Sequence, residues 1–142
     1  MREIIFRGNR KDNGESIFGY YFQKQNPFSA DGFPITHYIS DCPPFGAEVD
    51  PETVGQFTGK TDKNGKKVFE HDILQTFTVW ADGTVEKGGV GVIQWSENDQ
   101  CYVLATKEGY HIDDFGNLGR PEYYEVIGNI HDNPDLLEVH ND

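Results

Sequence analysis

The sequence predicts a mainly β fold, a β-rich α+β domain in which an N-terminal hairpin accompanies a small SH3-like antiparallel barrel with one or two short helical turns. Three observations lead to this expectation. Aromatic and β-branched residues alternate over short runs, as in half-buried strands. Sixteen Gly and seven Pro divide the 142 residues into short elements. Ten Phe, seven Tyr and two Trp supply large apolar area although the hydrophobic content is only 36%.

Residues 1–48 are expected to form the hairpin and a loop region. The alternating runs 2–8 and 16–23 indicate two strands, and the Asn-Gly step between them favours a tight turn. Asn-Pro and Asp-Gly steps then break the chain before a short strand over 35–40. The Pro-Pro step predicts that 41–48 holds no regular element.

Residues 49–142 are expected to form the barrel-like region, so that the whole chain, 1–142, is one domain. Asp50 can cap a one-turn helix that begins at Pro51, and a second short helix is expected from Pro134 through Leu137. The segment 107–122 is expected to be an irregular, mobile loop. An antiparallel meander should close the barrel with strands over 72–80, 88–96, 101–106 and 123–130.

The stretch "TGKTDKNGKKVFEHD", residues 58–72, resembles a ligand-binding loop at first sight. Asp62 and Asn64 have the alternate spacing of EF-hand oxygen ligands, but Gly65 follows directly and nearby lysines oppose a cation. The spacing from Gly59 to Gly65 does not match a phosphate-binding loop. We therefore expect a hairpin with Asn64 and Gly65 at positive φ and with solvated lysines beside it.

The formal net charge of −12 is uneven, because residues 97–142 hold eleven acidic and two basic side chains, which gives 2 − 11 = −9. This surplus disfavours non-specific binding to phosphate backbones. The first residues include no apolar run typical of a signal peptide, and no segment has the length and apolarity of a membrane span. A cytoplasmic protein that does not act at a membrane is the expectation.

Catalytic, cofactor-binding and metal-ligating residues are not expected. Five histidines lie near acidic residues, but none shows the spacing of a metal motif. The best candidate group is His111 with Asp113 and Asp114. Cys42 and Cys101 lack a neighbouring base and are expected to be small buried hydrophobes.

Basic residues suggest an interaction surface. Aromatic side chains could stack on bases beside them, although the expectation is that Tyr20, Tyr21, Phe22 and Trp95 belong to the core. The candidate interaction surface consists of Lys60, Lys63, Lys66, Lys67, Arg7 and Arg10.

Several segments in the same order resemble the YopX protein family, whose members are encoded mainly by bacteriophages and prophages. They are "MREIIFRG", "FGYYF", "VDPETVGQFTGKTDKNGKKVFEHDIL", "GVIQW" and "YEVIGNIHDNPDLL". One departure is visible, since the family usually has Gly where His71 precedes Asp72. The resemblance implies a phage or prophage origin in a bacterial cytoplasm, and it implies no activity.

The function expected from these observations is that of a non-enzymatic phage accessory protein acting through protein–protein contacts. Its partners would be a second copy of the chain, in a homo-oligomer, and an unidentified phage or host protein. One alternative is nucleic-acid binding through the basic hairpins, and another is a metal-dependent hydrolase using the 111–114 loop. One hydrophobic core is predicted, with Phe6, Ile73, Ile93, Trp95, Val126 and Ile127 or its neighbours.

Overall fold

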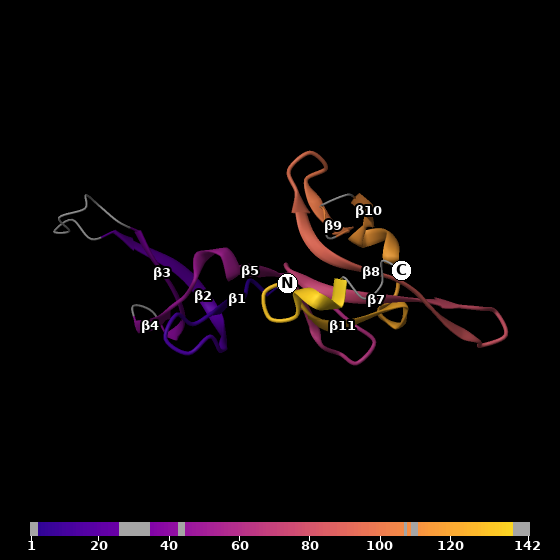
Figure 1. The fold of residues 1–142 in the computed structure, drawn as a ribbon, viewed down its shortest axis with the longest axis horizontal. Helices are drawn as coiled ribbons and strands as arrows, with labels where there is room; N and C mark the ends of the chain where they lie inside the picture. Colours follow the sequence, from indigo (N-terminus) through magenta and orange to yellow (C-terminus); the bar gives the residue numbers. More distant parts are fainter. Residues whose placement is uncertain (1–2, 26–34, 43–44, 107, 109–110, 138–142) are drawn as a thin grey trace. The chain divides into compact units, whose positions relative to one another are not determined.

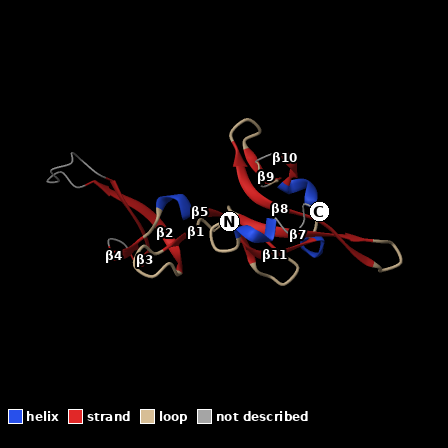
Figure 2. Cartoon of the chain, in the orientation of Figure 1, coloured by secondary structure: helices blue, strands red, loops and turns tan. Residues whose placement is uncertain are grey.

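The computed structural model describes residues 3–25, 35–42, 45–106, 108 and 111–137, and strands dominate them (Figure 1). The helical elements drawn in Figure 2 are single 3-10 turns. The mainly β prediction is therefore confirmed. Contacts divide the chain into two compact units, 1–57 (unit 1) and 58–142 (unit 2). This boundary lies inside strand β5, Gly55–Thr61. The expectation from the sequence is a single domain, 1–142, with regions 1–48 and 49–142.

Unit 1 contains an antiparallel sheet with the strand order β4-β3-β2-β1-β5. The predicted hairpin pairs β1 with β2, with Phe6 opposite Gly19. The prediction that 41–48 is irregular is wrong, because residues after the Pro-Pro step return to the sheet and pair Ala47 with Ile39. The bounds are β1 Phe6–Asn9, β2 Ser16–Gln25, β3 Ile35–Cys42 and β4 Phe45–Glu48.

A capped helical turn, η1 (Pro51–Thr53), connects β4 to β5 as the sequence predicted. The Asp50 carboxylate accepts a hydrogen bond from the Glu52 amide at 3.1 Å. The Thr53 hydroxyl donates to the Asp50 carbonyl at 2.6 Å and accepts from the Asn9 amide at 2.8 Å. These bonds fix the turn against β1 through side chains that are short and polar.

Unit 2 contains a five-stranded antiparallel sheet with the order β10-β9-β8-β7-β11, and its β6 pairs with the end of β5. The segment 107–122, expected to be irregular, carries a strand and two 3-10 turns, although 107 and 109–110 lie outside the described residues. The strands are β6 Lys67–Phe69, β7 Asp72–Val79, β8 Val85–Ser96, β9 Cys101–Ala105, β10 His111–Asp114 and β11 Tyr124–Asn129. The turns are η2 Phe115–Leu118, η3 Pro121–Tyr123 and η4 Pro134–Leu137.

The SH3-like barrel is not formed, because the sheet of unit 2 stays open. The meander β7-β8-β9 is present, but β11 pairs with β7 at one edge while β10 lies at the other edge. Separate elements cover the two faces: η2 contacts β9, and η4 contacts β8. A sheet covered on both faces does not need to close on itself to bury its apolar side chains.

Two hydrophobic clusters lie on opposite faces of this sheet, where the sequence predicted one core. Neighbouring residues alternate between them, as period-2 geometry requires. The first cluster contains Val68, Leu74, Ile93, Leu104, Phe115, Tyr124 and Val126. The second contains Ile73, Val92, Ala105 and Leu137, with Val90, Ile127, Ile130 and Leu136 packed against it.

Two members of the predicted core are misplaced. Trp95 follows the buried end of β8, is 41% exposed, and contacts Tyr102 edge-on with 5.1 Å between ring centroids. Phe6 lies in unit 1, where it is half-buried against Tyr21 at 5.6 Å. Ile73, Ile93 and Val126 are buried as predicted.

The far ends of β7 and β8 extend beyond the clusters as a two-stranded arm (Figure 1). Exposed apolar side chains of Val79, Trp80 and Val85 lie at its tip. At its base, the Gln75 amide donates to the Gly88 carbonyl at 2.9 Å. This polar contact fixes the position where the arm leaves the packed part of the sheet.

Candidate functional site

The hairpin tip at residues 62–66 is organised by a buried carboxylate. Asp62 is 2% exposed, and its Oδ1 accepts from the amides of Asn64 and Lys66, both at 2.9 Å. Its Oδ2 accepts from the Val126 amide in β11, also at 2.9 Å. Asp62 therefore stabilises the turn and holds it against a strand that is distant in sequence.

This network supports the prediction that 58–72 is a hairpin rather than a calcium loop or a phosphate loop. The Gly65 amide donates to the Asp62 carbonyl at 3.0 Å, and Gly65 has a φ of 78°. Asn64 does not have a positive φ, so the prediction that both residues of the Asn-Gly step would have one is wrong for Asn64. Burial raises the pKa of the Tyr124 phenol, with a smaller contribution from Asp62, so this phenol stays neutral.

His71 stands where the hairpin leads into β7. Its φ is 79°, in the left-handed region that favours glycine. Its amide donates to the Ile93 carbonyl at 2.8 Å, and its carbonyl accepts from Ile130 at 3.0 Å. The neighbouring Asp72 is buried and accepts from the Phe69 amide at 2.8 Å. His71 thus combines a backbone conformation typical of glycine with an imidazole side chain.

The predicted basic residues are divided between the two units. Lys60 and Lys63 lie over aromatic rings of unit 2, with their Nζ atoms 5.5 Å from the Phe115 centroid and 4.5 Å from the Phe77 centroid. Such cation–π contacts orient the ammonium groups. Lys66 and Lys67 are exposed.

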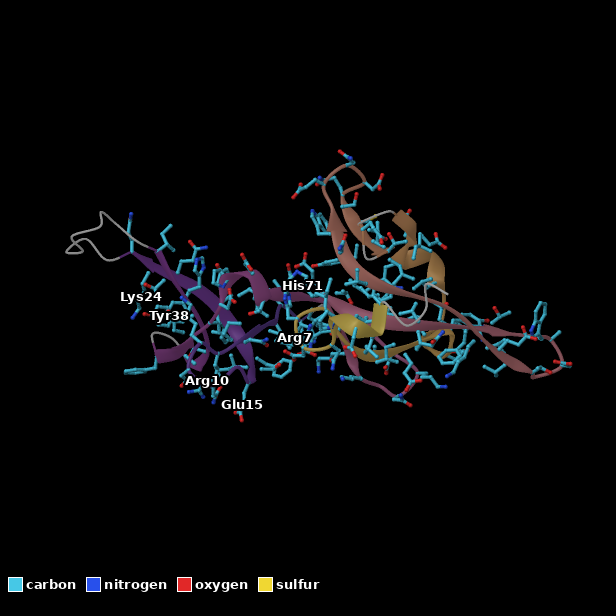
Figure 3. All side chains as sticks on the ribbon, in the orientation of Figure 1. Arg7, Arg10, Glu15, Lys24, Tyr38 and His71 are labelled. Atoms are coloured by element: carbon cyan, nitrogen blue, oxygen red, sulfur yellow. The ribbon has the colours of Figure 1, made fainter. Side chains whose placement is uncertain are left out.

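In unit 1, Arg7 is buried and Arg10 is partly exposed. The Arg10 guanidinium contacts Asp12 with an N–O distance of 2.7 Å, and this hydrogen bond lowers the pKa of the Asp12 carboxyl. Figure 3 shows Arg10 near Glu15 at the hairpin turn. The positive charge of Arg10 is therefore compensated locally, which reduces its value for binding phosphate.

The 111–114 segment forms β10 and pairs with β9. The Asp114 amide donates to the Asp113 carboxylate at 2.9 Å. The His111 side chain lies outside the described residues. Burial raises the pKa of the nearby Cys101 thiol, and the charges of Asp114 and Asp99 raise it further. A raised pKa opposes thiolate chemistry at Cys101. The side chain of Cys42 lies outside the described residues.

Side chains of unit 1 border two hollows that share Phe18 and Asp41 in their linings, and together we call them the Phe18 groove. The larger hollow, of ≈ 670 Å³, is lined by Glu3, Ile4, Ile5, Phe18, Gly19, Tyr20 and Asp41. The smaller one, of ≈ 250 Å³, shares Phe18 and Asp41 and also reaches Phe45. Phe18, Tyr20 and Phe45 are 51%, 59% and 77% exposed. Three large aromatic side chains thus face solvent beside these two hollows.

The backbone of Gly19 forms part of the wall of the Phe18 groove. Its φ is 152°, and a Cβ atom built there would approach the Ser40 carbonyl oxygen to 2.5 Å. Only glycine fits this approach between β2 and β3 without displacing backbone. The groove therefore depends on a specific local geometry of the sheet and not only on side-chain composition.

The sequence expectation that the aromatics of β2 belong to the core is wrong for Tyr20. Phe18, Tyr20 and Phe22 alternate along the strand as expected, but no local feature of the sequence indicates that Phe18 and Tyr20 are exposed while Phe22 is half-buried. Farther along the same strand, Lys24 lies 5.4 Å from the Tyr38 ring centroid (Figure 3). On the opposite side of β2, the Tyr21 hydroxyl and His37 Nδ1 are 2.6 Å apart.

The described residues offer little for other classes of site. Within them, no three His, Cys, Asp or Glu side chains gather in an arrangement that could hold a metal ion. In the same part of the chain, no helix has both the length and the apolarity needed to span a membrane.

Comparisons with known proteins give one family match. The family model described as YopX protein matches residues 5–138. A comparison with curated proteins found no match. Among solved structures, protein EF1440 from Enterococcus faecalis is 22% identical, with a TM-score of 0.46. That alignment covers 96% of this chain and 99% of the other.

Proposed function

The chain belongs to the YopX protein family, and from this premise we propose that it is a non-enzymatic phage or prophage accessory protein that binds another protein through the Phe18 groove. The proposal includes a bacterial cytoplasm as its place of action. The observation that carries it is the exposure of Phe18, Tyr20 and Phe45 beside two neighbouring hollows, both of which Phe18 lines. Exposed aromatic groups beside a concavity are typical of interaction sites.

The charge of the groove indicates the chemistry of its occupant. Among the described residues, its lining includes two carboxylates, Glu3 and Asp41, and no Lys or Arg. The net charge of −12 extends the same sign over the chain as a whole. We therefore infer a partner segment in which a Lys or Arg stands next to apolar side chains, since complementary charge favours encounter and apolar contact supplies most of the affinity.

A peptide display library tests this proposal. Selection on the full chain at ~0.15 M salt, where the Debye length is about 8 Å, should enrich segments that combine basic and apolar residues. The double variant Phe18→Ser, Tyr20→Ser should lose this enrichment, and Asp41→Lys should select against the basic residue. Trp80→Ser is the matched control, because it removes an aromatic that is 52% exposed in unit 2.

Enrichment that survives loss of both aromatics would overturn the proposal. So would binding to DNA or RNA that weakens steeply with salt and depends on Lys66 and Lys67, because that is the behaviour of a nucleic-acid interface. The homo-oligomer expected from the charge pattern stays a prediction. Light scattering at micromolar concentration checks it, and the mass of a single chain would contradict it.

A further inference from the structure

Two imidazole rings from distant parts of the sequence meet at one end of the unit 2 sheet. His71 precedes β7, and His131 follows β11. Their rings are edge to face, with centroids 4.8 Å apart, and His71 Nδ1 lies 3.1 Å from His131 Nε2. Because Asp72 pairs with Asn129 across the two strands, the sheet itself sets this separation.

The backbone on each side of the pair is fixed. His71 is held by hydrogen bonds to Ile93 and from Ile130, and its left-handed conformation sets the direction of the side chain. The Asn129 side chain accepts from the amides of His131 at 3.0 Å and Asp132 at 2.9 Å. Its amide group donates to the Asp132 carboxylate at 3.0 Å. The two rings therefore project from rigid turns, and only their side-chain torsions need to adjust on binding.

We propose that His71 Nδ1 and His131 Nε2 form a two-histidine site for a borderline transition-metal ion, with Zn²⁺ as the reference case. Zn–N bonds of about 2.0–2.1 Å at a tetrahedral angle place two ligand nitrogens about 3.3–3.4 Å apart. The observed 3.1 Å is close to that spacing. A small rotation of each ring turns both nitrogen lone pairs from each other toward a common point.

The chemistry of the pair selects the class of ion. Neutral imidazole nitrogens suit Zn²⁺, Cu²⁺ and Ni²⁺, whereas Ca²⁺ and Mg²⁺ prefer oxygen ligands. In the absence of metal, one ring donates its N–H to the lone pair of the other. Before both nitrogens can bind a metal ion, the donating ring must change tautomer, so that its proton sits on its other ring nitrogen. Since no third ligand side chain joins the pair among the described residues, the remaining coordination positions belong to water or to a donor from another molecule.

Thermal unfolding and NMR of the tag-free full chain test the site. Zn²⁺ should raise the unfolding midpoint saturably, and Mg²⁺ should not. The ¹⁵N resonances of His71 Nδ1 and His131 Nε2 should shift on Zn²⁺ addition. His131→Gln and His71→Gly should abolish both responses, and His71→Gly keeps a residue suited to a φ of 79°.

Two control variants separate this site from other zinc ligands. His37→Gln removes an imidazole of unit 1 that is bonded to Tyr21, and Cys101→Ser removes the thiol of β9. Both should keep the Zn²⁺ response. A wild-type chain that shows no response, variants at 71 and 131 that keep it, or loss of the response in Cys101→Ser would each overturn the proposal.

Discussion

The two units use the same antiparallel sheet architecture in opposite ways. In unit 2 the sheet is covered on both faces, and side chains such as Ile73 and Ile93 have no exposed surface. In unit 1 the sheet leaves Phe18, Tyr20 and Phe45 half or more exposed. Burial of apolar area is the main favourable term in folding. The comparison therefore indicates that apolar burial contributes more to the stability of unit 2, whereas unit 1 leaves large apolar side chains exposed to solvent.

The largest expected difference between the units comes from truncating one side chain in each. Ile93→Ala removes a fully buried side chain from the first cluster and should cost about 2–5 kcal/mol in the free energy of unfolding. Phe18→Ala removes a side chain that is 51% exposed and should change the stability by no more than about 0.5 kcal/mol. Urea denaturation measures both. Equal losses would mean that Phe18 contributes to folding as much as Ile93 does, and would contradict the proposed role of the Phe18 groove.

A second comparison uses two hairpin turns of similar design. Asp62→Ala leaves three buried or partly buried amides without their acceptor and should cost about 1–3 kcal/mol. Asp82 is the exposed counterpart in the arm, where it accepts from the Thr84 amide at 2.9 Å. Asp82→Ala should produce a smaller loss. A comparable loss at both positions would show that the hydrogen bond from the Val126 amide of β11 to Asp62 adds nothing to the free energy of unfolding.

The backbone at residue 71 provides a sharper and smaller test. His71→Gly and His71→Ala both remove the ring contact with His131, but only alanine keeps a Cβ atom in the left-handed region. The glycine variant should be more stable than the alanine variant by about 1 kcal/mol. Differential scanning calorimetry of the two variants without metal gives this difference. If the alanine variant were the more stable one, the backbone at residue 71 would have to leave the left-handed region in that variant, contrary to this expectation.

The smallest effect is expected from Ca²⁺ and Mg²⁺ at the 62–66 hairpin. The Asp62 carboxylate already accepts three amide hydrogen bonds and is 2% exposed. These ions should therefore leave the unfolding midpoint unchanged, because the oxygens of this carboxylate are already engaged and buried, and so cannot coordinate a cation. A saturable rise with Ca²⁺ that Asp62→Ala removes would contradict the network described above.

Sequence reasoning succeeded where the information was local. An Asn-Gly step predicted the turn before β2, and Asp50 next to Pro51 predicted the capped turn η1. It failed where a distant element decided the outcome. The open sheet depends on η2 and η4, which cover its two faces. The alternating residues of β8 do not indicate that the covered part of the strand includes Ile93 but leaves Trp95 exposed.

The candidate sites show the same limit. The lysines near residue 63 were visible as a charge cluster, but the rings beneath two of them were not. The Phe18 groove requires the pairing of β2 with β3, and the histidine pair requires β7 to lie beside β11. Neither arrangement leaves a signature within a short stretch of sequence, because each joins residues through the register of the strands.

The placement of the two tryptophans has a consequence for spectroscopy. Trp80 and Trp95 are the complete set in the chain, both lie in unit 2, and both are about half exposed. Their emission in the folded protein will already resemble that of indole in water, so unfolding will change its wavelength little. Fluorescence will also carry no tryptophan signal from unit 1. Near-ultraviolet circular dichroism, which responds to the edge-to-face pair of Phe115 and Tyr124 at 5.3 Å, is the better optical reporter of the packed interior.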